Sequence, residues 1–222
     1  MPGPRRARVG AVLGLCVTAL VVGCARPNFQ YAAESPGSTP AGTVYFKVPD
    51  VWTRFPPAQI AAAQRQWSTG TDAGSLLAAT AWQAAYDSSE RPSLDHVLGR
   101  AVPAQPVVYA SLRSLYPEEQ TGATTAALRE LVVPVSALGA AVTVRSEADV
   151  TQGRATGVHQ VVSYSPGQGL PEETIDQTSY LSDAKDAVYL LMVRCSTTCY
   201  DAHRAEIASV TSSFTIQEGR SG

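Results

Sequence analysis

Residues 187–216 read AVYLLMVRCSTTCYDAHRAEIASVTSSFTI, a strand followed by the closing elements of a domain. Residues 188–193 are apolar on both alternating faces, which is typical of a strand covered by other elements on each side. We therefore expect this strand in the middle of a sheet whose two faces are both covered. A helix is expected over Tyr200–Thr211. Residues 200–216 contain five more apolar side chains that we expect to be buried in the domain. They are Tyr200, Ile207, Val210, Phe214 and Ile216.

Two more strands precede this one at short intervals. Arg154–Tyr164, Thr174–Leu181 and Asp186–Cys195 are joined by turns that contain Pro166-Gly167 and Asp183. Strands linked by such short turns pair as neighbours, so the spacing predicts an antiparallel meander.

The N-terminal half of the domain mixes strands and helices. A strand is expected over Val44–Val48 and a helix over Ala58–Trp67. Residues 78–87 are alanine-rich, as in a helix, but their larger side chains alternate with period two, which favours a strand. Further elements are expected over Pro92–Leu98 (helix), Pro106–Tyr116 (strand), Thr124–Leu131 (helix) and Leu138–Glu147 (turn and strand).

These elements predict an α+β fold, a twisted antiparallel sheet with helices packed on both faces. The roughly 175 residues from about position 43 are enough for one domain with a real core. We therefore assign a single domain to residues 43–218.

The first 23 residues have the organisation of an export signal. Arg5, Arg6 and Arg8 precede the uncharged apolar run Val9–Val22, which is shorter than the roughly 20 residues of a membrane-spanning helix. The run ends in LVVGC at positions 20–24, which resembles a bacterial lipobox. In such a motif, the small Gly23 fits the peptidase and the thiol of Cys24 accepts the diacylglyceryl group. The alternative, an uncleaved anchor with an ordinary cysteine, fits the cleavage residues less well.

The predicted product is a lipoprotein on the extracytoplasmic face of the cell membrane, held there through lipid at Cys24. Two acyl chains give stable anchoring where one would be marginal. Residues 24–42 are rich in Pro, Ser, Gly, Ala and Thr, so we expect the lipidated cysteine to be followed by a flexible tether.

The charge of the mature chain argues against polyanionic partners. The whole chain has 17 basic and 19 acidic residues, and removal of the three signal arginines leaves 14 basic residues and a formal charge near −5. A mildly acidic protein of this kind is a poor candidate for nucleic acid and for electrostatic docking on anionic lipid.

Two of the four cysteines remain available for pairing. Cys16 leaves with the signal peptide and Cys24 is consumed by lipid, which leaves Cys195 and Cys199 in an oxidising compartment. We expect a disulfide between them, worth about 2 kcal/mol in the chain-entropy model. A redox or metal site is the alternative, but redox motifs have the spacing Cys-x-x-Cys and zinc needs further ligands.

The sequence holds no motif of an enzyme active site. A nucleophile elbow, a phosphate-binding glycine loop and a zinc-binding His-Glu-x-x-His helix are all missing from it. The best cluster is Asp201, His203 and Glu206, which could contribute to a metal site but also fits a solvated helix face. We therefore expect no enzymatic activity, no cofactor and no metal.

Other chemically active side chains have simpler explanations. The adjacent pairs Glu118-Glu119 and Glu172-Glu173 are expected to be solvated loop charges, and His159 to lie on one face of its strand. Trp52, Trp67 and Trp82 could line a ligand groove, but tryptophans in such positions more often pack in the core.

Two stretches resemble the Mog/PsbP-like superfamily. They are the opening strand with Pro-x-x-Trp (VYFKVPDVW, 44–52) and the closing strand, loop, helix and Ser-Phe (187–216). The resemblance covers residues 43–217 and extends to the LpqN-type lipoproteins of actinobacteria. It implies a sheet with helices on both faces and a non-enzymatic protein that binds partner proteins or other ligands. It implies no particular site residue.

The leading functional hypothesis is a membrane-anchored, non-catalytic module that binds an envelope protein or a lipid or glycolipid in a groove between sheet and helices. A structural accessory subunit of a membrane complex is the first alternative. An envelope hydrolase built on Asp201, His203 and Glu206 is the second.

Overall fold

The computed structural model describes residues 28–34, 42–67, 79–99, 101–167 and 169–217. Its main element is a seven-stranded sheet in the order β3-β4-β5-β9-β8-β7-β6, in which every neighbouring pair is antiparallel. The strands are β3 (Thr53–Phe55), β4 (Thr80–Asp87), β5 (Val107–Ser114), β6 (Val142–Gln152), β7 (Ala155–Tyr164), β8 (Glu173–Leu181) and β9 (Ala187–Ser196). The predicted meander is therefore confirmed as β7-β8-β9.

Strand β9 lies at the centre of this sheet, between β5 and β8, as its apolar sequence predicts. Alternate side chains of β9 point to opposite faces of the sheet. Leu191 and Val193 are fully buried on one face, and Val188 and Met192 are buried on the other. We call the first the α8 face and the second the α1 face, after the helices that cover them.

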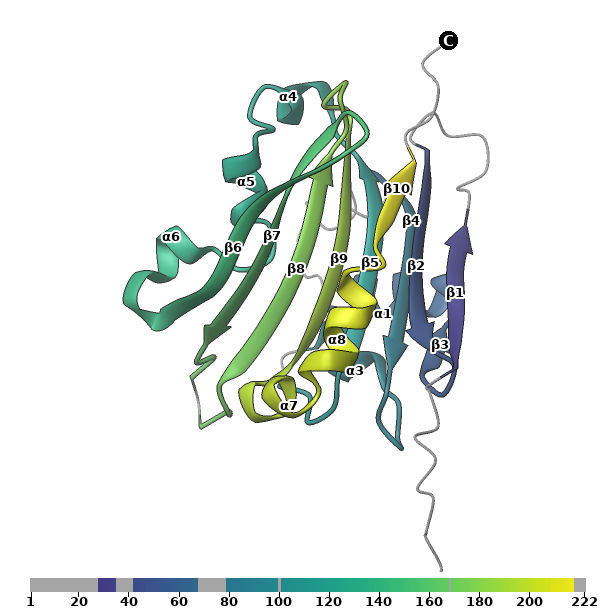
Figure 1. Cartoon of the computed structure of the whole chain (residues 1–222), viewed down its shortest axis with the longest axis vertical. Helices are drawn as coiled ribbons and strands as arrows, with labels where there is room; N and C mark the ends of the chain where they lie inside the picture. Colours follow the sequence, from purple (N-terminus) through teal and green to yellow (C-terminus); the bar gives the residue numbers. More distant parts are fainter. Residues whose placement is uncertain (1–27, 35–41, 68–78, 100, 168, 218–222) are drawn as a thin grey trace, which may run out of the picture.

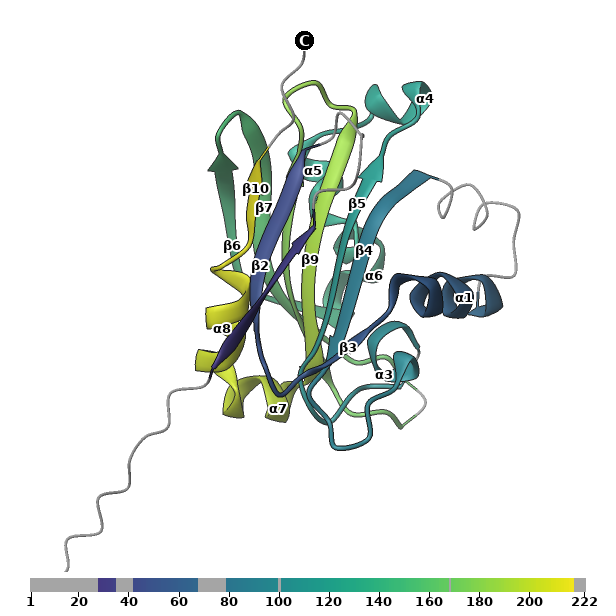
Figure 2. The same cartoon turned by 90° about the vertical axis from the view of Figure 1, so that its right-hand side faces the viewer.

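The α8 face is covered by a second, three-stranded sheet and by two helices. The second sheet has the order β1-β2-β10, with bounds Phe29–Glu34, Thr43–Pro49 and Thr215–Gln217. The helices are α7 (Thr197–Ala202) and α8 (Arg204–Thr211). Figures 1 and 2 show β2, β10 and α8 on the same side of the main sheet. The sequence predicted strand β2 but not that it would join a separate sheet.

The main core of the protein lies beneath this layer. Val44, Phe46 and Val48 of β2 point inward and are at most 1% exposed. They belong to one apolar cluster with side chains of β4, β5, β9 and α8. Each such side chain contributes about 1.5–3 kcal/mol on burial, so β2 is firmly held on the main sheet.

The α1 face is covered by short helices and has three smaller clusters. Figure 2 shows α1 and α3 on the side opposite β2 and α8. One cluster lies under α1 and α3, one under α5, and one around Val133 and Met192. The helices are α1 (Pro57–Trp67), α3 (Leu94–Leu98), α4 (Pro117–Gln120), α5 (Thr125–Arg129) and α6 (Val135–Leu138), with a 3-10 turn at Gly139–Ala141. Helices on both faces confirm the predicted α+β architecture.

Strand β1 lies in the segment that was predicted to be a flexible tether. Phe29–Glu34 pairs with β2 in antiparallel register, from Phe29 opposite Pro49 to Glu34 opposite Val44. The segment FQYAAE contains no proline or glycine, so its backbone can complete the ladder that β2 offers. A strand at Phe29–Glu34 therefore lies within the segment that was expected to be a flexible tether.

The C-terminal helix also differs from the prediction of one helix over Tyr200–Thr211. The structure divides this region into α7 and α8 at His203, whose φ of −105° and ψ of 15° are not helical. Ser196 caps α7 by accepting a hydrogen bond from the backbone N–H of Cys199. The break lets both short helices follow the surface of the sheet, and the predicted apolar positions Tyr200, Ile207 and Val210 are buried as expected.

Candidate functional site

The predicted lipidation site lies outside the described residues. Gly23 and Cys24 both precede Asn28, the first described residue, so the signal peptide and its cleavage stay predictions. No helix in the described part of the chain is long and apolar enough to span a membrane.

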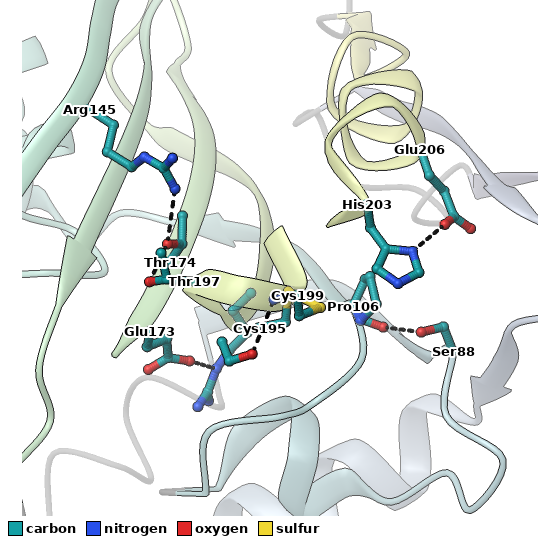
Figure 3. The surroundings of a disulfide bond; sticks show 12 residues. Ser88, Pro106, Arg145, Glu173, Thr174, Cys195, Thr197, Cys199, His203 and Glu206 are labelled. Atoms are coloured by element: carbon teal, nitrogen blue, oxygen red, sulfur yellow. Dashed lines mark hydrogen bonds and ion pairs between the residues drawn. A yellow bond between two sulfur atoms is a disulfide. The ribbon is translucent and has the colours of Figure 1, made fainter. Parts of the chain in front are cut away.

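Cys195 and Cys199 form a disulfide, in line with their spacing. Cys195 is near the end of β9 and Cys199 is in the first turn of α7, and both are buried. Figure 3 shows the bond where the strand turns into the helix. It fixes the angle at which α7 leaves the sheet, so we regard it as structural.

The three residues of the candidate metal cluster do not converge on one point. The carboxylate of Asp201 accepts hydrogen bonds from Arg145 and Arg204. His203 Nδ1 is instead 3.1 Å from Glu206 Oε2, and Figure 3 shows these two side chains turned toward each other. Glu206 also accepts a hydrogen bond from the indole N–H of Trp52. Over the described residues, no group of three or more His, Cys, Asp or Glu side chains could hold a metal ion.

The expectation that both Glu172 and Glu173 are solvated is wrong for Glu173. Glu173 begins β8, is 1% exposed and pairs with the guanidinium of Arg194 on β9. Tyr164 also donates to this carboxylate, at 2.6 Å. Arg194 Nη1 donates to the backbone carbonyls of Val97 and Gly99, and Nη2 donates to that of Ala101. The pair therefore joins the end of α3 to the central strands.

The tryptophans with described side chains belong to the core. Trp52 and Trp82 are 3% and 6% exposed and lie in the main cluster, where the ring of Trp82 meets that of Phe46 edge to face. The side chain of Trp67 lies outside the described residues. Trp52 and Trp82 are therefore packing residues, not the walls of a groove.

A buried carboxylate that the sequence did not single out lies on the α8 face. Asp176 of β8 is 3% exposed and accepts hydrogen bonds from Tyr200 at 2.9 Å and from His159 Nε2 at 2.9 Å. The guanidinium of Arg145 lies over the ring of Tyr200. The hydrogen bond between His159 and Asp176 raises the pKa of His159, although partial burial acts in the opposite direction. The group fixes α7 to the sheet through polar contacts.

The raised pKa of His159 makes stability depend on pH. Protonated His159 stabilises the folded state below its unfolded pKa of about 6.5, and this contribution disappears as pH rises through the higher folded pKa. We expect the wild type to lose more stability between about pH 5.5 and pH 9 than His159→Gln does. Urea unfolding of both proteins across this range measures the difference. Parallel pH profiles of the two would contradict the assignment.

An apolar cavity of about 230 Å³ lies on the α1 face between the sheet and the helices α4 and α5. Its walls include Leu115, Leu128, Leu181 and Val188, which are 3–8% exposed. Leu131 lies at its edge and is 37% exposed. The cavity is therefore an apolar space that solvent can reach.

Arg113 and Glu119 form the polar part of the cavity lining. Arg113 Nη1 is 2.7 Å and 2.9 Å from the two carboxylate oxygens of Glu119. Burial opposes ionisation of Glu119, but hydrogen bonds from the backbone of Tyr116 and from Arg113 lower its pKa overall. The two charges thus compensate each other beside the apolar walls. Arg113 lies near the end of β5 and Glu119 lies in α4, only six positions later, so the short turn between these elements brings the two side chains together.

Comparison with known proteins finds similarity at the level of structure. No family model matches the chain, and no curated protein matches it in sequence. The PsbP of the cyanobacterium Synechocystis matches with a TM-score of 0.49 and 9% identity, over 88% of this chain and 96% of that one. The Ran-binding protein Mog1p of Saccharomyces cerevisiae has a TM-score of 0.47 and 11% identity, over 86% and 96%.

LpqN of Mycobacterium tuberculosis, described as involved in cell envelope biogenesis, has a TM-score of 0.45 and 14% identity, over 85% of this chain and 91% of that one. These three proteins are what the chain is similar to in structure. Because the TM-scores and identities are low, we take the case for function from this chain's own residues.

Proposed function

We propose that this chain is a lipoprotein of the outer face of the cell membrane that binds the apolar part of an envelope lipid or glycolipid without catalysing a reaction. The observation that carries the proposal is the apolar cavity between the sheet and the helices α4 and α5. Its position agrees with the groove between sheet and helices that the sequence predicts.

The chemistry of the cavity favours an apolar group with a polar, uncharged head. The apolar walls offer no hydrogen bonds, so they favour a hydrocarbon group over a polar one. Known ligand pockets measure about 300–1,000 Å³. This cavity, at about 230 Å³, is smaller, so it holds a short apolar group rather than a whole lipid. The compensated pair of Arg113 and Glu119 offers donors and acceptors but no net charge, which suits hydroxyl groups of a head.

A bulky side chain at the cavity lining should block binding. Ala127 of α5 is exposed and lines the cavity, so we expect Ala127→Trp to weaken binding of a fluorescent fatty alcohol at least tenfold. Ala126→Trp is the matched control, because Ala126 is also exposed on α5 but does not line the cavity. Fluorescence titration measures both dissociation constants. Equal affinities, or no binding by the wild type, would contradict the proposal.

The anchor is tested separately by mass spectrometry of protein extracted from membranes. The lipobox at residues 20–24 supports a mature chain that begins at Cys24 and carries a diacylglyceryl group. A chain that keeps residues 1–23, or that begins at Cys24 without lipid, would remove this part of the proposal.

A further inference from the structure

The outer face of the three-stranded sheet carries exposed aromatic side chains. In β2, Val44, Phe46 and Val48 point into the core, so Tyr45 and Lys47 point outward. Tyr45 is 37% exposed. This face is turned away from the main sheet, as Figure 2 shows for β2 and β1.

Strand β1 extends this face. Tyr31 is directly opposite Lys47 in the register and is 78% exposed, and the ammonium of Lys47 lies 4.6 Å from the centre of the Phe29 ring. Val51, in the turn after β2, is 82% exposed. We call this group the aromatic patch; it consists of Phe29, Tyr31, Tyr45, Lys47 and Val51.

The aromatic patch begins very close to the predicted anchor. Phe29 is only five positions after Cys24, and a fully extended chain spans at most about 3.6 Å per residue. The Cα atom of Phe29 therefore lies within about 18 Å of the lipidated residue. A tether of 19 residues would have left the domain free to turn, but strand β1 removes most of that length.

The side chains of the patch suit the interface of a bilayer. Tyrosine and other amphipathic aromatic rings concentrate at the level of the lipid headgroups, and lysine can extend its ammonium toward phosphate while its stem stays in apolar surroundings. Lys47 is the only charged member of the aromatic patch, so attraction by charge alone does not explain the patch. The fit is that of aromatic and aliphatic groups to lipid.

We infer that the aromatic patch lies in the interface of the membrane that holds Cys24 and gives the domain a fixed orientation on it. The inference rests on the anchor in the proposed function. It commits to a lipid surface as the occupant of the patch, because the anchor places that surface within reach of Phe29. No other partner is placed there by the chain itself.

The test places an environment-sensitive fluorophore at single positions of the full-length lipidated protein. Val51→Cys and Tyr31→Cys report on the aromatic patch, and Glu118→Cys on α4, which Figure 1 shows at the far end of the molecule from the start of β1, is the control. Labelling without reduction leaves the Cys195–Cys199 disulfide intact. The proteins are incorporated into vesicles of phosphatidylethanolamine and phosphatidylglycerol with or without nitroxide-labelled lipid.

We expect nitroxide lipid to quench the labels at positions 51 and 31 at least threefold more than the label at position 118. The difference should persist at about 1 M salt, where charge attraction is screened over about 3 Å. Equal quenching at the three positions would overturn the inference. So would protection of positions 51 and 31 from water without quenching by lipid, since a second copy or another protein would then cover the patch.

A second variant keeps the interpretation independent of the label. Tyr31→Ser with Tyr45→Ser alters only outward-facing groups, so it should fold normally and lower the quenching at position 51 toward that at position 118. Unchanged quenching in this variant would overturn the role of the aromatic rings. Mass spectrometry of the same samples separates a missing anchor, which contradicts the proposed function, from a lipidated protein that does not dock.

Discussion

Replacement of Arg194 by methionine should lower the free energy of unfolding by about 3–5 kcal/mol. Methionine fills much of the same space but supplies no donor. The carboxylate of Glu173, which is 1% exposed, would keep Tyr164 as its hydrogen-bond donor and lose its counter-charge. The carbonyls that now receive N–H groups of Arg194 would also lose a partner. Urea unfolding measures the loss as a lower midpoint.

Arg113→Met is the matched control for this prediction. Arg113 also makes an ion pair, with Glu119, but these side chains are 20% and 33% exposed, so water can replace the lost contact. Such a partly exposed pair is worth about 1 kcal/mol or less. The double variant Arg194→Met with Glu173→Leu should recover part of the loss, because no buried charge is left unpaired. An Arg194→Met variant no less stable than Arg113→Met would show that the buried pair is not the essential contact.

Replacement of Gly157 by alanine should lower the free energy of unfolding by about 3 kcal/mol. Gly157 is buried in β7 opposite Tyr180 of β8. A Cβ atom there would clash with the backbone carbonyl of Ser179 and would lie 2.6 Å from Tyr180 Cδ1. Backbone atoms of a paired strand cannot rotate away, so the β7–β8 ladder must open locally.

Gly122→Ala adds the same methyl group where there is room for it. The nearest atom to a Cβ at Gly122 is the carbonyl oxygen of Glu119, at 3.7 Å. The expected change is within about 1 kcal/mol, and reduced freedom of the unfolded chain can make it favourable. Thermal unfolding of both variants gives the comparison. A Gly157→Ala protein that unfolds at the wild-type temperature would contradict the close approach.

The sequence predicts those parts of the fold in which local pattern and final environment agree. Apolar residues on both faces of 188–193 place β9 at the centre of the sheet, and the period-two pattern of 80–87 outweighs its alanine content. The second sheet could not be predicted in the same way. The alternation of Val44, Phe46 and Val48 shows one inward face, but it does not say which strands pair along the two edges of β2.

Interactions between distant residues explain what the sequence analysis missed at the sites. Glu173 follows another glutamate in a polar stretch, which indicates solvent exposure, and its partner Arg194 is 21 residues away on a neighbouring strand. Asp176 likewise meets Tyr200 only after α7 has folded back on the sheet. Arg194, which follows the apolar residues of β9, could have indicated a buried ion pair, because a charge at a buried position needs a partner.

The cavity could be predicted only in outline. The hypothesis placed a groove between sheet and helices without naming its residues, and the walls of the cavity come from β5, α4, α5, β8 and β9. These residues are separated by up to 75 positions along the chain, from Arg113 to Val188. No periodic pattern within one element shows that the side chains of five elements leave a space between them.

The position of β1 determines from which side a ligand would reach the cavity. The strand starts at one end of the molecule, and Figures 1 and 2 show α4, which contributes Glu119 to the cavity, at the other end. Under the proposed anchoring at Cys24, the cavity would lie on the side of the domain away from the membrane. A ligand would then enter the cavity from the aqueous space beyond the membrane surface rather than directly from the lipid leaflet.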